Sequence, residues 1–279
     1  MAAAAMSEGE AGKALWNAAK AGNVEEATRL LEAGAPVSWA DQRFRWSPFA
    51  IAALSERLPL MRLLLEHGAD LEAKDQSGQT ALIMSAANGK ADVTALLLEH
   101  GADLEAKDQY GQTALKAAVV SASVATMALL LEHGADLEAK DQSGQTALIM
   151  SAANGKADVT ALLLEHGADL EAKDQSGQTA LIMSAANGKA DVTALLLEHG
   201  ADLEAKDQSG QTALIMSAAN GKADVTALLL EHGADLEAKD QDGRGVASVC
   251  WGARCRELLG GAERLQRWHR RRSLVVWCA

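Results

Sequence analysis

The chain has 279 residues and a net charge of −12, and 48% of its residues are hydrophobic but only 3% are aromatic. The acidic excess argues against a nucleic-acid backbone as partner; it favours either a protein partner with a basic segment or solubility alone. All three cysteines lie in the last thirty residues, which excludes a disulfide framework and indicates a reducing compartment.

Residues 1–8 are rich in alanine and then polar, and we expect them to be disordered. They lack the basic start and the apolar core of a signal peptide. No stretch of the chain approaches the ~18 apolar residues of a membrane-spanning helix. We therefore expect no membrane partner and a cytoplasmic location, with the nucleus as the alternative.

Most of the chain is a repeated sequence. The string DQSGQTALIMSAANGKADVTALLLEHGADLEAK occurs four times letter for letter, and three looser copies accompany it. A fixed period of this size indicates a solenoid, in which each copy buries its apolar face only against its neighbours. We number the copies repeats 1 to 7; they span 9–40, 41–74, 75–107, 108–140, 141–173, 174–206 and 207–239.

Each identical repeat begins with a turn and a short helix, as repeat 3 illustrates. Asp75–Gly78 has Asp first and Gly fourth, which is typical of a type I turn. Thr80 supplies a hydroxyl to cap the first N–H groups of a helix, predicted from about Ala81 to Ala87. Gly89 ends this helix, since glycine accepts the left-handed conformation.

A second helix is predicted from about Ala91 to His100, with Asp92 in its first turn and His100 in its last. Both placements favour the helix dipole. Each helix is too short to persist alone in water, so its leucines must pack against the next repeat. Stacking is therefore obligatory.

One histidine recurs at the end of the second helix of successive repeats. Equivalent positions on stacked repeats lie on the order of 10 Å apart, so they cannot converge on one metal ion. We interpret these residues as helix-terminal groups favoured by the dipole, with a collective pH response as the weaker hypothesis. They are His67, His100, His133, His166, His199 and His232.

The pattern D-x-x-G-x-T-x-L at Asp75, Gly78, Thr80 and Leu82, followed by A-A-x-G, L-L-L-E-x-G-A-D and a closing A-K, resembles the ankyrin repeat. The resemblance runs from roughly residue 13 to 243. It implies an all-α solenoid of stacked helix-turn-helix repeats with short β-hairpin fingers. Members of that family bind partners with their fingers and inner helices.

The chain departs from the family pattern in ways that change its chemistry. The family's T-P-L-H is Thr80-Ala81-Leu82-Ile83 here, so the first-position proline and a histidine that links neighbouring repeats are missing. Glu105 stands where the family most often has asparagine, which adds a negative charge to each finger.

The resemblance implies that partners contact the turn after the leading aspartate and the end of the first helix. The identical repeats carry small polar residues there, whereas repeat 2 has Arg43-Phe44-Arg45-Trp46 and repeat 4 has Tyr110, Val120 and Ser121. Binding hot spots favour Trp, Tyr and Arg. The candidate partner-binding residues are Arg43, Phe44, Arg45, Trp46, Gln76, Ser77, Gln79, Asn88, Tyr110, Gln112, Val120 and Ser121.

Structural explanations compete with binding at these positions. The insertion at Arg43–Trp46 could simply cover the first repeat interface together with Trp16 and Trp39, and Tyr110 could be drift at an exposed turn. Lys116 replaces an apolar residue; it either extends to the surface or pairs with a neighbouring acid.

The C-terminal region breaks the period. Residues 240–263 are predicted to be a degenerate cap that covers the apolar face of repeat 7, and 264–279 form a basic and then apolar tail. The tail could serve nuclear import, bind acidic groups, carry phosphorylation at Ser273 or fold back on the array. Cys250, Cys255, His269 and Cys278 match no common zinc spacing, so we expect no metal.

The sequence contains no Gly-rich phosphate loop and no Ser, His and Asp set apart from the repeats. It therefore predicts a non-catalytic, monomeric protein-interaction scaffold without a cofactor. The alternative is a substrate adaptor of a ubiquitin ligase, because a C-terminal module of similar length follows the ankyrin arrays of such adaptors. Here the likeness is limited to Cys-Arg-x-Leu-Leu at 255–259.

Overall fold

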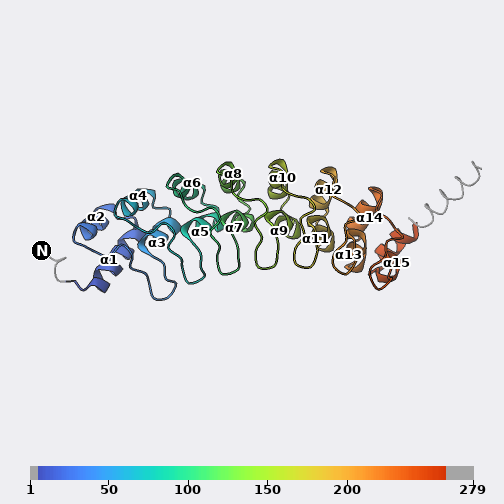
Figure 1. Ribbon diagram of the computed structural model, residues 1–279, viewed down its shortest axis with the longest axis horizontal. Helices are drawn as coiled ribbons and strands as arrows, with labels where there is room; N and C mark the ends of the chain where they lie inside the picture. The colour runs from blue at the N-terminus through green and yellow to red at the C-terminus, as the bar shows by residue number, and fades with distance from the viewer. Residues whose placement is uncertain (1–5, 262–279) are drawn as a thin grey trace, which may run out of the picture. The chain divides into compact units, whose positions relative to one another are not determined.

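A computed structural model describes residues 6–261 of the chain. The basic tail, with Ser273, lies outside the described residues. The chain forms two units, Met1–Gln142 and Ser143–Ala279. Within each unit the first helices of the repeats form one row and the second helices another, and loops called fingers here project beside the first row (Figure 1).

Unit 1 holds the first four repeats. Its first helices pack side by side in the order α1, α3, α5, α7, and the second helices follow the order α2, α4, α6, α8. The helices are α1 Glu8–Ala21, α2 Val24–Glu32, α3 Pro48–Leu54, α4 Leu58–Glu66, α5 Ala81–Ala87, α6 Ala91–Glu99, α7 Ala114–Ser121 and α8 Val124–Glu132.

Unit 2 repeats the arrangement and then closes it. A further helix at 253–261 follows α15, and α15 packs on α13, where Val246, Cys255 and Leu259 are buried. The labelled helices are α9 Ala147–Asn154, α10 Ala157–Glu165, α11 Ala180–Ala186, α12 Ala190–Glu198, α13 Ala213–Ala219, α14 Ala223–Glu231 and α15 Val246–Val249.

The helix predictions for repeat 3 are confirmed. Helix α5 spans Ala81–Ala87, and the Ile83 backbone N–H donates to the Thr80 hydroxyl at 3.3 Å. Helix α6 ends at Glu99, with His100 as its C-terminal cap residue. Gly89 ends the first helix with φ of 66°, in the left-handed region that favours glycine.

The N-terminal prediction is wrong at its boundary, because α1 already begins at Glu8. The Glu10 backbone N–H donates to the Ser7 hydroxyl at 3.3 Å, and the Ser7 N–H donates to the Glu10 carboxylate at 2.9 Å. These reciprocal bonds form a capping box. The polar residues of the expected disordered lead-in are thus the start signal of a helix.

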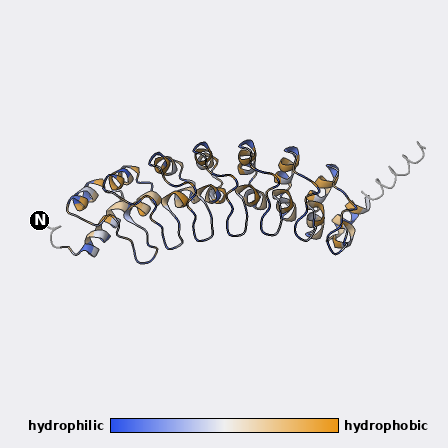
Figure 2. Cartoon of the chain, viewed as in Figure 1, coloured by the Kyte–Doolittle hydropathy of each residue, from blue (hydrophilic) through white to orange (hydrophobic). Residues whose placement is uncertain are grey.

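The core of each unit is aliphatic and thin. Leu82, Ile83, Val93 and Leu97 are at most 1% exposed, and each buried side chain contributes about 1.5–3 kcal/mol through the hydrophobic effect. Figure 2 shows hydrophobic residues gathered on the helices, while the finger loops are mainly hydrophilic. Among the described residues, no helix is long and apolar enough to cross a membrane.

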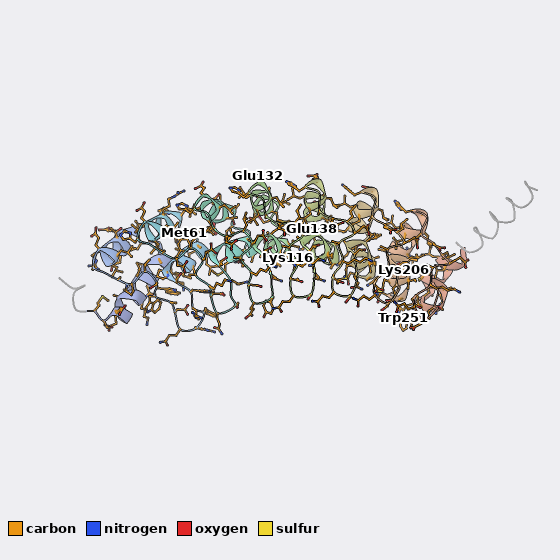
Figure 3. All side chains as sticks on the ribbon, viewed as in Figure 1. Met61, Lys116, Glu132, Glu138, Lys206 and Trp251 are labelled. Atoms are coloured by element: carbon orange, nitrogen blue, oxygen red, sulfur yellow. The ribbon has the colours of Figure 1, made fainter. Side chains whose placement is uncertain are left out.

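A buried hydrogen bond links the two helices of repeat 3. The Ser85 and Thr94 hydroxyl oxygens are 3.0 Å apart, and the same contact recurs in the identical repeats of unit 2. Repeat 4 has Ala118 and Met127 at these positions, both fully buried. Repeat 2 makes the same exchange, with Ala52 and Met61 (Figure 3). Repeats 2 and 4 therefore replace a polar pair by a packed apolar pair.

Successive fingers of unit 1 are joined by backbone and side-chain hydrogen bonds. The Asp103 and Asp136 N–H groups donate to the carboxylates of Glu72 and Glu105, each at 2.9 Å. The glutamate that departs from the family pattern therefore connects one finger to the next. Within residues 6–261, the fingers contain one isolated β-bridge, Lys239–Gly245, and otherwise run as turns.

The repeated histidine also has a specific contact. His100 Nδ1 lies 2.8 Å from the Leu96 carbonyl, and the five equivalent histidines make the same contact at 2.8–2.9 Å. A carbonyl oxygen can only accept, so Nδ1 carries the hydrogen. The same carbonyl also accepts the backbone N–H of the histidine. Each histidine thus adds a second hydrogen bond to a carbonyl of the last helical turn, in agreement with the helix-terminal interpretation.

Candidate partner-binding surface

The finger of repeat 2 carries one extra residue and is organised around Asp41. Its carboxylate accepts the backbone N–H groups of Arg43, Phe44 and Trp46 at 3.0, 2.9 and 2.7 Å. Arg45 has φ of 60°, in the left-handed region, at the place where repeat 3 has Gly78 with φ of 77°. A side chain in this conformation costs roughly 1–2 kcal/mol, so this turn holds its arginine under strain.

Three side chains of this finger form an ordered stack. The rings of Phe44 and Trp46 stack with centroids 4.7 Å apart, and the Arg43 guanidinium lies 4.8 Å from the Phe44 centroid. The Trp46 indole N–H also donates to the Asp75 carboxylate of the next finger at 3.4 Å. Phe44 remains 40% exposed. The hydrogen bond of Trp46 therefore fixes one ring of the stack, while the Phe44 ring is partly exposed to solvent.

The fingers bring Phe44, Ser77 and Tyr110 into one row. The Gln76 N–H donates to the Phe44 carbonyl, Gln109 to Ser77 and Gln142 to Tyr110, at 2.9–3.0 Å. These carbonyls occupy the same position in three consecutive fingers. Tyr110 is 58% exposed and Val120, near the end of α7, is 60% exposed. The aromatic residues of repeats 2 and 4 thus flank a small serine.

The polar candidates are more engaged in the repeats themselves. The Ser121 hydroxyl donates to the Ala86 carbonyl at 2.8 Å and so links α7 to α5, and the Asn88 amide donates to Met84 in its own helix at 2.7 Å. Gln79 and Gln112 are half-buried, and their N–H groups donate to the leading aspartates of their turns at 2.9 Å. Gln76 is exposed.

Repeat 4 also buries a charge. Lys116 on α7 is 1% exposed and its ammonium lies 2.6 Å from the carboxylate of Asp141, whose side chain is 9% exposed (Figure 3). Of the two sequence-based alternatives, pairing is therefore confirmed. Burial lowers the pKa of Lys116, while the hydrogen bond and charge of Asp141 act in the opposite direction.

The threonine that should cap α7 differs from its equivalents. Thr80 accepts a helical N–H, whereas the Thr113 hydroxyl is buried and has no hydrogen-bond partner within residues 6–261. An unsatisfied buried hydroxyl costs about 1–3 kcal/mol. No sequence signal pointed to this loss, because Thr113 occupies the expected cap position.

The row of first helices and the loops beside it make this chain a helical repeat protein with large side chains exposed on its fingers. Within the described residues, no group of three or more His, Cys, Asp or Glu side chains could hold a metal ion.

The comparisons with known proteins agree with this class. A family model described as ankyrin repeats (3 copies) matches residues 49–141, 103–174 and 148–240. The chain belongs to the ankyrin repeat family. The solved ankyrin repeat domain of Bcl-3, described as a unique member of the IkappaB protein family, is 31% identical with a TM-score of 0.70; the match covers 77% of this chain and 98% of that one. No curated protein matches the chain. Ankyrin repeats are generally protein–protein interaction modules.

Proposed function

We propose that the chain is a non-catalytic, monomeric scaffold of the cytoplasm or nucleus that binds a protein partner on the finger and inner-helix face of unit 1. The observation that carries the proposal is the Arg43–Phe44–Trp46 stack, whose members are ordered before any partner arrives. Ordering an interface side chain on binding costs about 0.5–1.5 kcal/mol, and a preformed stack avoids that cost. Exposed Arg, Trp and Tyr are also the commonest anchors of interfaces.

The placement of Tyr110 supports one continuous surface. It occupies the same finger position as Phe44 and lies two repeats further on. At about 10 Å per repeat, the two rings are roughly 20 Å apart, well within an interface of ordinary size. Val120 and the polar residues between the rings complete the proposed contact area, which the small Ser77 leaves open at its centre.

The composition adds a proposal about long-range attraction. A net charge of −12 favours the approach of a partner with a basic segment. Such steering acts on the association rate and is screened by salt. An association rate that does not change with ionic strength would contradict it.

The ubiquitin-ligase adaptor remains the alternative function, and it depends on the segment 240–279. The described part of that segment packs as a cap, with α15 on α13. We favour the scaffold for this reason. Co-purification of ligase scaffold subunits with the full chain would instead favour the adaptor.

The proposed function is tested on a partner identified by affinity purification with the full chain. Phe44→Ser and Tyr110→Ser introduce the residue that repeat 3 carries at the same finger position, so the variant is expected to fold. We expect the double variant to bind at least about 30-fold more weakly, because loss of a hot spot costs about 2 kcal/mol or more. Ser176→Ala, at the equivalent finger position of unit 2, is the control. Unchanged affinity of the double variant, with an unchanged thermal midpoint, would show that the site is wrongly assigned.

A further inference from the structure

The C-terminal cap of unit 2 brings two cysteines together. Cys250 follows α15 directly and is half-buried, whereas Cys255 lies on the helix at 253–261 and is 1% exposed; both are free thiols. The Trp251 backbone N–H donates to the Ala218 carbonyl of α13 at 2.8 Å, and the Cys255 thiol donates to the same carbonyl at 4.0 Å. The segments that carry the two cysteines therefore meet at one carbonyl near the end of α13.

The two thiols also interact directly. Burial, followed by a hydrogen bond with Cys255, raises the pKa of Cys250 to about 12. The thiolate is the form that attacks a disulfide, so Cys250 reacts slowly at neutral pH. A second thiol in contact favours the disulfide at equilibrium, because the bond-forming step is then intramolecular. The pair is therefore slow to oxidise but well placed to share a bond.

The cap lacks interactions that stabilise the complete repeats. In repeat 7 the Thr212 hydroxyl accepts the Ile215 N–H at 3.4 Å, whereas Gly245, at the equivalent position, has no side chain to cap the four-residue helix α15. The ion pair between Arg254 and Asp224, with N and O atoms 2.9 Å apart, joins side chains that are each 74% exposed. Such exposed pairs contribute little to stability. A covalent bond within the cap would therefore act where the other contacts are weak.

We propose that Cys250 and Cys255 are a modification site, at which a small-molecule disulfide of the glutathione type drives formation of a reversible intramolecular disulfide. One cysteine thiolate attacks a sulfur of the small disulfide, releases one small thiolate and leaves a mixed disulfide on the chain. The second cysteine loses its proton to solvent, attacks the protein sulfur of the mixed disulfide and displaces the second small thiolate. The chain loses two electrons and two protons, and the small disulfide is reduced to two thiols.

The backbone between the two cysteines permits the adjustment that a disulfide requires. Cys250 lies in a segment without regular structure, and Gly252 in that segment has φ of 92°, in the left-handed region. The spacing is Cys-x4-Cys, and so short a loop constrains the unfolded chain less than a long one does. We therefore expect the bond to be readily reduced again, as redox-sensing disulfides of reducing compartments are.

The proposal is tested on the full chain carrying Cys278→Ser, which removes the third cysteine of the sequence; Cys250→Ser in the same background is the matched control. Both proteins are equilibrated with mixtures of oxidised and reduced glutathione, and free thiols are blocked under denaturing conditions. Trypsin then cleaves after Arg254, between the two cysteines. We expect mass spectrometry to show two peptides joined by a disulfide in the background protein, their separation after return to reduced glutathione, and no joined peptides in the control.

The same chain unfolded in concentrated urea provides the second comparison. We expect the equilibrium constant for disulfide formation to be at least about tenfold larger in the folded chain, because the fold holds the thiols in contact. By linkage, the disulfide then favours the folded cap by the same factor.

Three results would overturn the proposal: an equilibrium constant in the folded chain no larger than in urea, glutathione adducts in place of the joined peptides, or a bond between two chains on non-reducing electrophoresis. The test is independent of the binding surface proposed for unit 1, since both cysteines lie in unit 2.

Discussion

Repeats 3 and 4 are neighbours in unit 1 with the same helix pair, yet different side chains pack between their helices. Repeat 3 joins its helices through Ser85 and Thr94, whereas repeat 4 fills the same space with Ala118 and Met127. At the position of Ile83, repeat 4 buries Lys116. Repeat 4 thus replaces a polar pair by an apolar pair and gives its buried lysine a carboxylate partner. It keeps the same helix pair as repeat 3 although its exposed residues differ.

The two repeats also differ in backbone strain. Repeat 3 ends its first helix with Gly89, but the equivalent residue of repeat 4 is Ala122, with φ of 52°. Repeat 2 places Arg45 and Glu56 at such positions, with φ of 60° and 56°. Within the described residues, every left-handed residue other than glycine belongs to repeats 2 and 4. The repeats that carry the candidate anchors are the ones that carry this strain.

The largest expected effect comes from breaking the buried ion pair between Lys116 of repeat 4 and Asp141, the first residue of repeat 5. Asp141→Asn should lower the free energy of unfolding by about 3 kcal/mol, because the buried ammonium of Lys116 loses the carboxylate that faces it at 2.6 Å. Urea denaturation followed by circular dichroism measures this loss. Asp174→Asn removes the aspartate at the equivalent position of repeat 6, which accepts the N–H groups of Ser176 and Gln178, and is expected to cost less than half as much.

The complementary variant of this pair is Lys116→Ile, which restores the residue of repeat 3. It should leave the free energy of unfolding nearly unchanged, because repeat 3 already combines Ile83 with Asp108, the equivalent of Asp141. The pH supplies a second measurement. Burial lowers the pKa of Lys116 in the folded chain below its ordinary value of 10.5. At pH values between the folded pKa and 10.5, the unfolded chain therefore binds more protons than the folded chain. The stability of the unmodified chain relative to Lys116→Ile should therefore rise as pH approaches 10.5. A relative stability that falls over that window would contradict the assignment.

A smaller effect is expected when a single buried residue of repeat 4 is replaced by its equivalent from repeat 3. Met127→Thr in repeat 4 should cost about 2 kcal/mol, since it opens a cavity and buries a hydroxyl. Adding Ala118→Ser supplies the hydrogen-bond partner found in repeat 3 and should recover about 1 kcal/mol. A double-mutant cycle by urea denaturation measures the coupling, and additive losses would show that the two positions do not act as a pair.

The smallest expected effect is a gain in stability. Arg45→Gly should raise the free energy of unfolding by about 0.5–1 kcal/mol, because it relieves left-handed strain at some cost in unfolded-state entropy. Gly78→Arg, at the equivalent turn of repeat 3, should do the reverse. Thermal denaturation compares both variants, and a loss of stability in Arg45→Gly would mean that the arginine side chain stabilises its finger.

The helices could be predicted because their signals are local. The Thr80 hydroxyl, the glycine at position 89 and the apolar spacing between them are read within one repeat, and α5 has the predicted bounds. The ladder from Glu72 to Asp103 could not be found this way. It joins residues 31 positions apart whose approach depends on the stacking distance of two fingers.

The candidate surface was only partly predictable for a similar reason. Tyr110 and Phe44 were recognisable as large residues in a polar turn, and both are exposed. Asp141 has an equivalent in repeats 2, 3, 4, 6 and 7, so nothing in its own sequence marked it as the partner of Lys116. The strain at Arg45 did have a signal, namely its alignment with Gly78, once the extra residue is placed before Phe44.

The identical interfaces of unit 2 have a consequence for how such a chain can change. Helix α11 contacts both α9 and α13, and the two interfaces are built from the same sequence because repeats 5, 6 and 7 do not differ. Deleting 174–206 would join two surfaces that already fit. The length of this protein can therefore vary in steps of 33 residues without a new contact having to evolve, whereas removing repeat 4 would discard side chains found nowhere else in the array.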